Sequence, residues 1–255
     1  FAGRPAGRAA GGHSPEAAAK AAFGLMKLGR ADDVIATMEP GDLARFRRVL
    51  RSMVDTAIDK GEAEEVRQFF GVEVEELDGV DDAGFFRAYW DGLMGSAPEL
   101  REALEEAEIL TYGQVMEGPD TAHVLYRLAY ESGLAVPILV PRVVTLRRLD
   151  EGWALALGGG IEGMAPPDGG GPALPLPTGA TVHPLGFVVE GDSAAYVVYR
   201  CRISYDGGGQ LTGMYVYGVR RDDDGWAHVE RHDLAALVPI IEEGHGIAAL
   251  RARVG

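Results

Sequence analysis

The same stretch of 46 residues occurs twice in this chain of 255 residues, at 112–157 and at 185–230. The two copies align without a gap at a constant offset of 73 residues, and fifteen positions are identical, against roughly four expected by chance at this composition. The identical pairs are Gly113 and Gly186, Val115 and Val188, Glu117 and Glu190, Gly118 and Gly191, Ala122 and Ala195, Val124 and Val197, Tyr126 and Tyr199, Arg127 and Arg200, Val143 and Val216, Arg147 and Arg220, Arg148 and Arg221, Asp150 and Asp223, Gly152 and Gly225, Trp153 and Trp226, and Ala154 and Ala227. This duplication constrains the fold, because both copies are expected to form the same elements in the same order.

Each copy is predicted to form four antiparallel strands. A Glu-Gly turn closes one hairpin, and an Asp-x-Gly-Trp stretch closes a second one. Between the turns of the first copy, apolar residues alternate and mark one buried face: Ala122, Val124, Tyr126, Leu128 and Tyr130. The turns therefore fix the direction and register of the strands.

Residues 14–107 show helical periodicity instead. Ser14, followed by a proline and an acid, is suited to start a helix, and Gly29 is suited to end it. A second short helix is predicted from Asp32 to Met38, and Asp42 is predicted to cap a third helix with an apolar stripe over 43–58. Further helices are expected at 62–70, 82–94 and 98–107, so the fold class is α+β.

The predicted helix that starts near Asp82 carries a broad aromatic face with Phe86, Tyr89 and Trp90. Such a face has to be buried, and a sheet is the expected partner. If it lies opposite Tyr126 and Tyr130, these five residues would line an apolar chamber with a few hydroxyl groups, which is the usual composition of a small-molecule site. A filled aromatic core is the alternative.

Composition limits the partners. The formal net charge of −15 disfavours binding to nucleic acid, and no run of about 18 apolar residues predicts a membrane span. The single cysteine, Cys201, allows no intrachain disulfide and lies in an apolar run, which favours a buried thiol. Residues 1–13 are predicted to be a flexible tail. An exported chain after removal of a signal peptide and a cytoplasmic chain shortened at its start both fit this beginning.

Residues 158–181 are rich in glycine and proline and are predicted to be a linker. The expected domains are 14–157, with helices and the first sheet, and 182–255, with the second sheet and a closing helical segment. That last segment is predicted after Asp233, with a break at Pro239.

A helix that starts with Ser-Pro-Glu, a Gly-Arg-Ala-Asp-Asp turn into a second helix and strands that end in Asp-x-Gly-Trp resemble the nuclear transport factor two-like superfamily. The resemblance covers about 14–157 and implies a cone-like domain, in which a curved antiparallel sheet surrounds N-terminal helices. The second copy repeats only the sheet half, which departs from the family pattern.

The fold of this superfamily hosts isomerases, dehydratases, ligand carriers and structural domains, so the resemblance alone assigns no activity. Its steroid-isomerase branch needs a tyrosine donor and a carboxylic acid kept in an apolar pocket beside a general base. The strand acids Glu117, Glu131 and Glu190 lie instead at turns or strand ends. No catalytic residue, metal ligand or cofactor is therefore predicted. The function expected is non-enzymatic binding of an apolar small molecule, a peptide or a protein partner, with homodimerisation through a sheet surface as an option. An isomerase or dehydratase-like enzyme that uses the same cavity is the alternative.

Several suggestive patterns favour a simpler interpretation. The stretch 158–163 matches G-x-G-x-x-G, but prolines follow where a dinucleotide-binding loop needs a helix. His228 and His232 lack a third metal ligand, and the acidic runs 81–82 and 222–224 lack the spacing of a calcium loop. His123 and Arg127 are predicted to lie on the strand face opposite Tyr126, facing solvent or the other copy.

Overall fold

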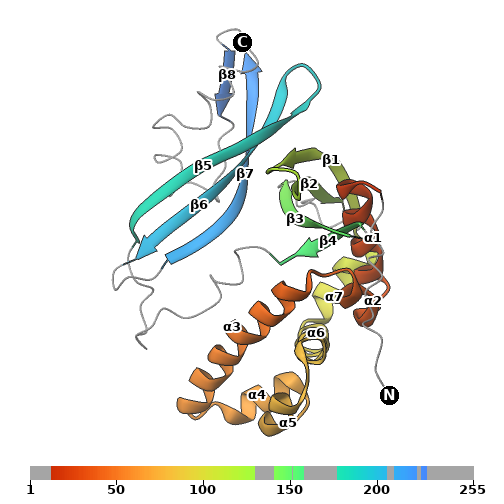
Figure 1. Cartoon of the computed structure of the whole chain (residues 1–255), viewed down its shortest axis with the longest axis vertical. Helices are drawn as coiled ribbons and strands as arrows, with labels where there is room; N and C mark the ends of the chain where they lie inside the picture. The colour runs from red at the N-terminus through yellow and green to blue at the C-terminus, as the bar shows by residue number, and fades with distance from the viewer. Residues whose placement is uncertain are drawn as a thin grey trace. The chain divides into compact units, whose positions relative to one another are not determined.

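The computed structural model describes residues 13–129, 141–150, 152–157, 177–205, 210–222 and 225–228. It confirms the α+β class, with helices followed by two antiparallel sheets. The helices in Figure 1 are α1 (Pro15–Lys27), α2 (Ala31–Ala36), α3 (Pro40–Asp59), α4 (Ala63–Phe70), α5 (Val74–Gly79), α6 (Asp82–Ser96) and α7 (Pro98–Glu106). The strands are β1 (Glu108–Met116), β2 (Thr121–Ala129), β3 (Arg142–Leu149), β4 (Gly152–Ala156), β5 (Pro177–Glu190), β6 (Ala194–Tyr205), β7 (Gln210–Asp222) and β8 (Gly225–His228).

By its contacts the chain forms two compact units. Unit 1 contains Phe1–Leu110, Leu128–Leu139 and Leu146–Leu157, and unit 2 contains Thr111–Arg127, Val140–Thr145 and Gly158–Gly255. Unit 2 thus combines the second copy of the repeat with parts of β1, β2 and β3 from the first copy. The sequence-based boundary at residue 157 separates the copies along the chain, whereas the contacts group parts of both.

The helices of unit 1 begin and end mostly where local signals place them. The Ser14 side chain accepts a hydrogen bond from the Ala17 amide at 3.2 Å, and Gly29 has the left-handed φ of 62° that follows a helix end. Asp42 is not the cap of α3, contrary to the prediction. The Glu39 carboxylate takes this role and accepts hydrogen bonds from the amides of Gly41 and Asp42, while Pro40 occupies the first helical position. Helix α5 had no counterpart among the predicted elements.

The segment between α2 and α3 pairs with β4. The Leu155 amide donates to the Thr37 carbonyl at 2.7 Å, and the Glu39 amide donates to the Leu155 carbonyl at 2.8 Å. Met38 therefore forms a parallel bridge with Leu155 and is not part of the second helix, which was predicted to reach it. The Asp42 side chain, only 9% exposed, accepts a hydrogen bond from the Leu157 amide at 2.9 Å and pairs with Arg45. This network fixes the start of α3 to the end of β4.

Each copy of the repeat forms a four-stranded sheet, with the orders β1-β2-β3-β4 and β5-β6-β7-β8. The first hairpin of each copy turns at equivalent glycines, Gly118 with φ of 70° and Gly191 with φ of 64°. Strand β5 already begins at Pro177 and pairs with β6 from there on, so 177–181 belong to the sheet and not to the predicted linker. The rest of that linker and the closing helical segment lie outside the described residues.

Strand β6 is the centre of unit 2, because residues on both of its faces are buried. One face contributes Val197 and Tyr199 to a cluster with β5 and β7. This cluster also contains Cys201, whose thiol is buried as predicted and has a pKa raised by that burial. The other face contributes Tyr196 and Val198 to a second cluster, which joins Val115, Leu125, Val188 and Val216. The second cluster therefore contains residues of both copies of the repeat.

We predict that Asp42→Ala lowers the free energy of unfolding of the helical part by about 1–3 kcal/mol, because the partly buried Leu157 amide and Arg45 each lose a partner. Chemical denaturation followed by circular dichroism at 222 nm measures this change. Asp55, whose side chain is 57% exposed and pairs with Arg51 on the same helix, provides the matched control. Asp55→Ala should change stability by less than about 0.5 kcal/mol, and an equal loss in both variants would contradict the tie between α3 and β4.

Candidate functional site

The predicted site residues Phe86, Tyr89 and Trp90 all lie on α6 in unit 1. Phe86 is buried, and Tyr89 and Trp90 are half-buried. Tyr126 is a half-buried residue of β2 and belongs to unit 2, and Tyr130 lies outside the described residues. A chamber formed by all five residues therefore remains a prediction.

The aromatic face of α6 packs on other helices. Phe46 of α3 contacts the rings of Phe86 and Tyr89, each at a centroid distance of 5.1 Å, and Phe69 of α4 contacts Tyr89 at 5.8 Å. Trp90 stacks on Phe86 at 6.4 Å. We expected a sheet against this face, and these ring contacts correct that expectation: α3 and α4 supply the partners.

The close approach of α4 to α6 explains the aromatic contacts. A Cβ atom at Gly92 of α6 would lie 2.2 Å from the Phe69 carbonyl oxygen, so only glycine permits this spacing. Tyr89, one turn earlier, then lies within reach of the Phe69 ring, and its burial raises the pKa of its hydroxyl. Tyr89 and Trp90 thus pack on the rings of Phe46, Phe69 and Phe86 and stay partly accessible.

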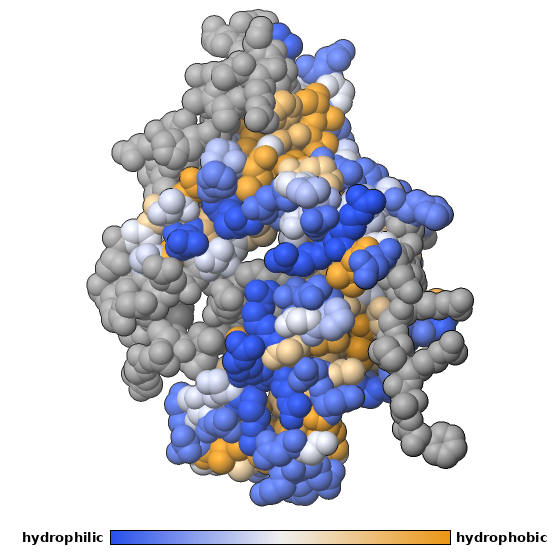
Figure 2. All heavy atoms as spheres, viewed as in Figure 1, coloured by the Kyte–Doolittle hydropathy of each residue, from blue (hydrophilic) through white to orange (hydrophobic). Residues whose placement is uncertain are grey.

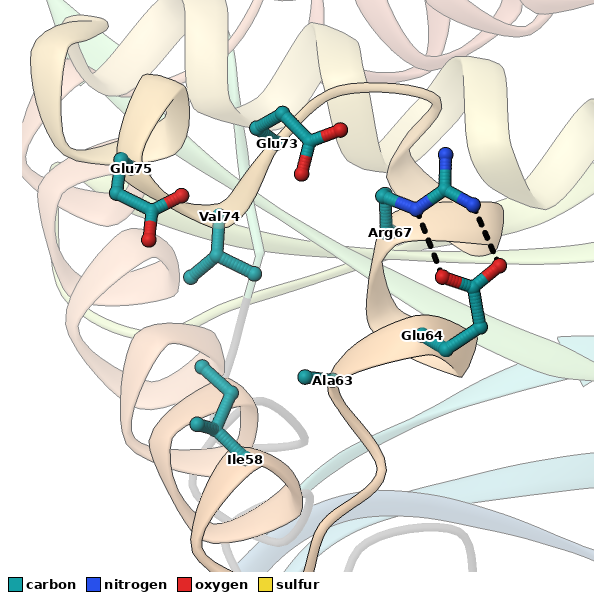
Figure 3. Close-up of a pocket in the computed structure, with 7 residues that line it drawn as sticks. All are labelled: Ile58, Ala63, Glu64, Arg67, Glu73, Val74 and Glu75. Carbon is teal, nitrogen blue, oxygen red and sulfur yellow. Dashed lines mark hydrogen bonds and ion pairs between the residues drawn. The ribbon is translucent and has the colours of Figure 1, made fainter.

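A cavity of about 310 Å³ lies near the end of α3, between α4 and the start of α5 (Figure 3). Ile58, Ala63 and Val74 form its apolar part, and the charged residues around it are Glu64, Arg67, Glu73 and Glu75. Arg67 and Glu64 form two hydrogen bonds, of 2.8 Å and 2.5 Å, on one side of the cavity, and the carboxylates of Glu73 and Glu75 lie on the other. Hydrogen bonds from Arg67 and Gln68 lower the pKa of Glu64 to about 2.

None of the predicted site residues lines this cavity. The surface around α3, α4 and α5 is mostly hydrophilic, with small apolar areas between the charged side chains (Figure 2). The side chains of Glu64 and Arg67 are about half exposed, so the cavity is a shallow depression. In the part of the chain that the structure describes, no group of three or more His, Cys, Asp or Glu residues could hold a metal ion.

A cluster of polar groups in unit 2 joins the two copies of the repeat. We call Glu117, His123, Thr145 and Arg200 the first polar cluster. His123 Nε2 lies 2.9 Å from Glu117 Oε2, and His123 Nδ1 lies 3.0 Å from Thr145 Oγ1. Arg200, from the other copy, donates to the same Glu117 Oε2 at 2.5 Å. The Glu117 carboxylate can only accept a hydrogen bond, so the neutral imidazole carries its proton on Nε2. Its Nδ1 then accepts a hydrogen bond from the Thr145 hydroxyl.

Burial and charge set the titration of the first polar cluster. The His123 side chain is only 1% exposed, and this burial lowers its pKa despite the hydrogen bond to Glu117. Partial burial acts to raise the pKa of Glu117, but the hydrogen bonds from Arg200 and His123 outweigh it, and the pKa is lowered. A hydroxyl, an imidazole and a carboxylate in series could transfer a proton, yet a histidine so deeply buried cannot reach a substrate in this conformation.

A second polar cluster consists of the residues that align with Glu117, His123 and Arg200 of the first. It consists of Arg127, Glu190 and Tyr196, and the offset of 73 residues aligns Tyr196 with His123. The Tyr196 hydroxyl donates to Glu190 at 2.5 Å and accepts from Arg127 of the first copy at 2.8 Å. Burial, together with the hydrogen bond to Glu190, raises the pKa of Tyr196 to about 12. In both clusters an arginine of one copy is therefore held by the turn glutamate of the other, directly or through a tyrosine.

The apolar contacts between the copies are reciprocal as well. A Cβ atom at Gly113 would lie 2.9 Å from Val188 Cγ1, and one at Gly186 would lie 2.7 Å from Val115 Cγ1. These are the same contact made twice, because Gly113 aligns with Gly186 and Val115 aligns with Val188. A contact in which residue i meets j and j meets i is the signature of a twofold, self-complementary interface.

The sequence predicts that His123 and Arg127 lie on a strand face toward solvent or the other copy, and in the structure this face points to the other copy. The sequence pattern did not predict that His123 is buried or that Arg200 contacts Glu117. The available signal was the retention of the same glutamate and the same arginine at a constant offset in both copies. That signal shows which residues matter but not that they pair between copies.

Comparisons with protein-family models, with curated proteins and with solved structures gave no match. None of the described helices is both long enough and apolar enough to cross a membrane.

We predict that Gly186→Ala lowers the free energy of unfolding of unit 2 by about 1–3 kcal/mol, because the added methyl overlaps Val115. Adding Val115→Ala should remove most of this penalty, so that the double variant is at least about 1 kcal/mol more stable than the sum of the single effects implies. Urea unfolding of the four chains measures this coupling.

Gly179, on the same strand, has no atom within 4 Å of an added Cβ and serves as the control. Gly179→Ala should stay within about 0.5 kcal/mol of the parent chain. Strict additivity between the substitutions at 186 and 115 would contradict the contact between the copies.

Proposed function

We propose that this chain is a binding protein and not an enzyme, and that an apolar small molecule or an apolar peptide segment binds against the aromatic face of α6. The observation that carries the proposal is the partial exposure of Tyr89 and Trp90 above a layer of buried rings. Aromatic side chains with one accessible face supply much contact area with few rotatable bonds, as is common in binding sites.

The distribution of polar groups supports binding over catalysis. The histidine and carboxylate that could exchange protons, His123 and Glu117, are engaged in contacts that hold the two copies together. The equivalent cluster uses Tyr196 where the first uses a histidine, so what the copies share is the link between them and not a reactive group. The isomerase or dehydratase-like alternative would need an acid–base group beside the aromatic face.

The proposal retains the resemblance to the nuclear transport factor two-like superfamily as its structural premise for a cavity near the helices. A ligand that contacts α6 alone would satisfy the proposal, because Tyr89 and Trp90 are both partly exposed on this helix.

We predict that the chain binds the neutral apolar dye Nile red, and that Trp90→Ala weakens this binding at least about tenfold, which corresponds to about 1.4 kcal/mol. Titration of each variant into the dye, followed by its fluorescence, gives the dissociation constants. Trp153→Phe is the matched control, because Trp153 is 8% exposed and lies on β4. Equal affinities of the Trp90 and Trp153 variants, or no binding by the parent chain, would contradict the proposal.

A further inference from the structure

We propose that the first polar cluster is an acid-operated latch between the two copies of the repeat: proton uptake by His123 weakens the Glu117–Arg200 ion pair and loosens the packing of β1 and β2 against β6. The proposal goes beyond ligand binding, because it assigns a conformational response to the sheet part of the chain. It rests on which atoms meet in this cluster and on how deeply the imidazole is buried.

One carboxylate oxygen makes both polar contacts of Glu117 in the first polar cluster. Glu117 Oε2 accepts the hydrogen bond from His123 Nε2 and also the one from Arg200 Nη2, at 2.9 Å and 2.5 Å. With a neutral imidazole, the carboxylate faces a single cation and the pair is balanced. A proton on His123 would place two cations against one carboxylate, and the new charge would have little access to water.

Among the residues that the structure describes, one carboxylate and one guanidinium are the charged groups that act on His123. The charged groups that the structure places against the ring are Glu117, from the turn after β1, and Arg200, from β6. Strand β3 contributes the uncharged hydroxyl of Thr145, which gives Nδ1 its hydrogen bond in the neutral form. The imidazolium can be hydrated only if the strands around it separate, so protonation and opening are coupled.

The direction of the pH effect follows from burial. His123 has a pKa lowered from its ordinary value of 6.5 in the closed state, while an opened state would restore that value. The closed state therefore keeps its full stability above pH 6.5 and loses stability as the pH falls from 6.5 toward the lowered pKa of the closed state, by at most about tenfold in the opening equilibrium per pH unit. Glu117 stays ionised in this range, because its pKa is lowered from 4.5.

The second polar cluster supplies an internal reference. Tyr196, with a pKa raised to about 12, keeps its proton at every pH between 5 and 8 and still links Arg127 to Glu190. His123→Tyr would give the first cluster the residue that the chain already uses at the aligned position. This substitution replaces the titrating ring with a non-titrating donor to the turn glutamate.

The test is hydrogen–deuterium exchange of backbone amides in the full chain at pH values from 5.0 to 7.5, corrected for the intrinsic exchange rate. In the parent chain, amide protection in β2 and β6 should fall as the pH drops below 6.5, by at most about tenfold per pH unit. In His123→Tyr, protection should stay constant across the range. His183→Tyr, which removes an exposed histidine of β5, should behave like the parent chain.

Protection in β2 and β6 that is independent of pH in the parent chain, or that falls equally in His123→Tyr, would overturn the proposal. If the variant does not fold, nitrogen-15 spectra of the His123 ring in the parent chain decide. A neutral ring protonated at Nε2 that persists well below pH 6.5 and is lost together with amide protection supports the latch. Titration at the ordinary pKa without any loss of protection refutes it.

Discussion

The packing of one copy of the repeat on the other, glycine against valine, is the contact on which the remainder of unit 2 depends. Val188 approaches the backbone at Gly113, and Val115 approaches the backbone at Gly186, at distances that leave no room for a Cβ atom. Only at such a separation can Arg200 reach Glu117 and Arg127 reach Tyr196. The apolar contacts thus set the spacing, and the charged contacts then bridge it. Burial of each valine, about 1.5–3 kcal/mol relative to exposure, outweighs the small net contribution of partly exposed ion pairs.

A self-complementary interface needs only one set of contact residues, because each copy of the repeat presents the same set. The retained residues of the interface act once from each side, and Glu117 and Glu190, like Arg127 and Arg200, take aligned places in the two polar clusters. The exception is the position occupied by His123 in one copy and Tyr196 in the other. Both side chains donate a hydrogen bond to the turn glutamate, but only the imidazole changes its charge near neutral pH. The proposed response to acid depends on this difference.

Local signals predicted most elements of this fold, since they depend on short-range physics. Ser14 caps α1, and the glycines at 118 and 191 turn the first hairpin of each copy with the left-handed φ that favours glycine. The failures involve long-range contacts. Asp42 looked like a helix cap but binds the Leu157 amide 115 residues away, and Glu39 replaces it as the cap. The partners of the aromatic face could not be read from α6 alone, because its periodicity shows that a face is apolar but not what covers it. Likewise, the burial of His123 depends on the approach of the two copies, which no alternation within a single strand encodes.

The most direct test of this reciprocal interface is a nuclear Overhauser measurement on the full chain, with methyl-labelled valine. We predict two strong cross-peaks, one between the Gly113 Hα protons and the Val188 methyl groups, and one between the Gly186 Hα protons and the Val115 methyl groups. Their simultaneous presence would show that the copies meet through the same contact made twice. If either cross-peak is absent while the strands β1, β2, β5 and β6 are formed, the copies do not pack in this way. The contacts between the copies in both polar clusters would then be wrong as well.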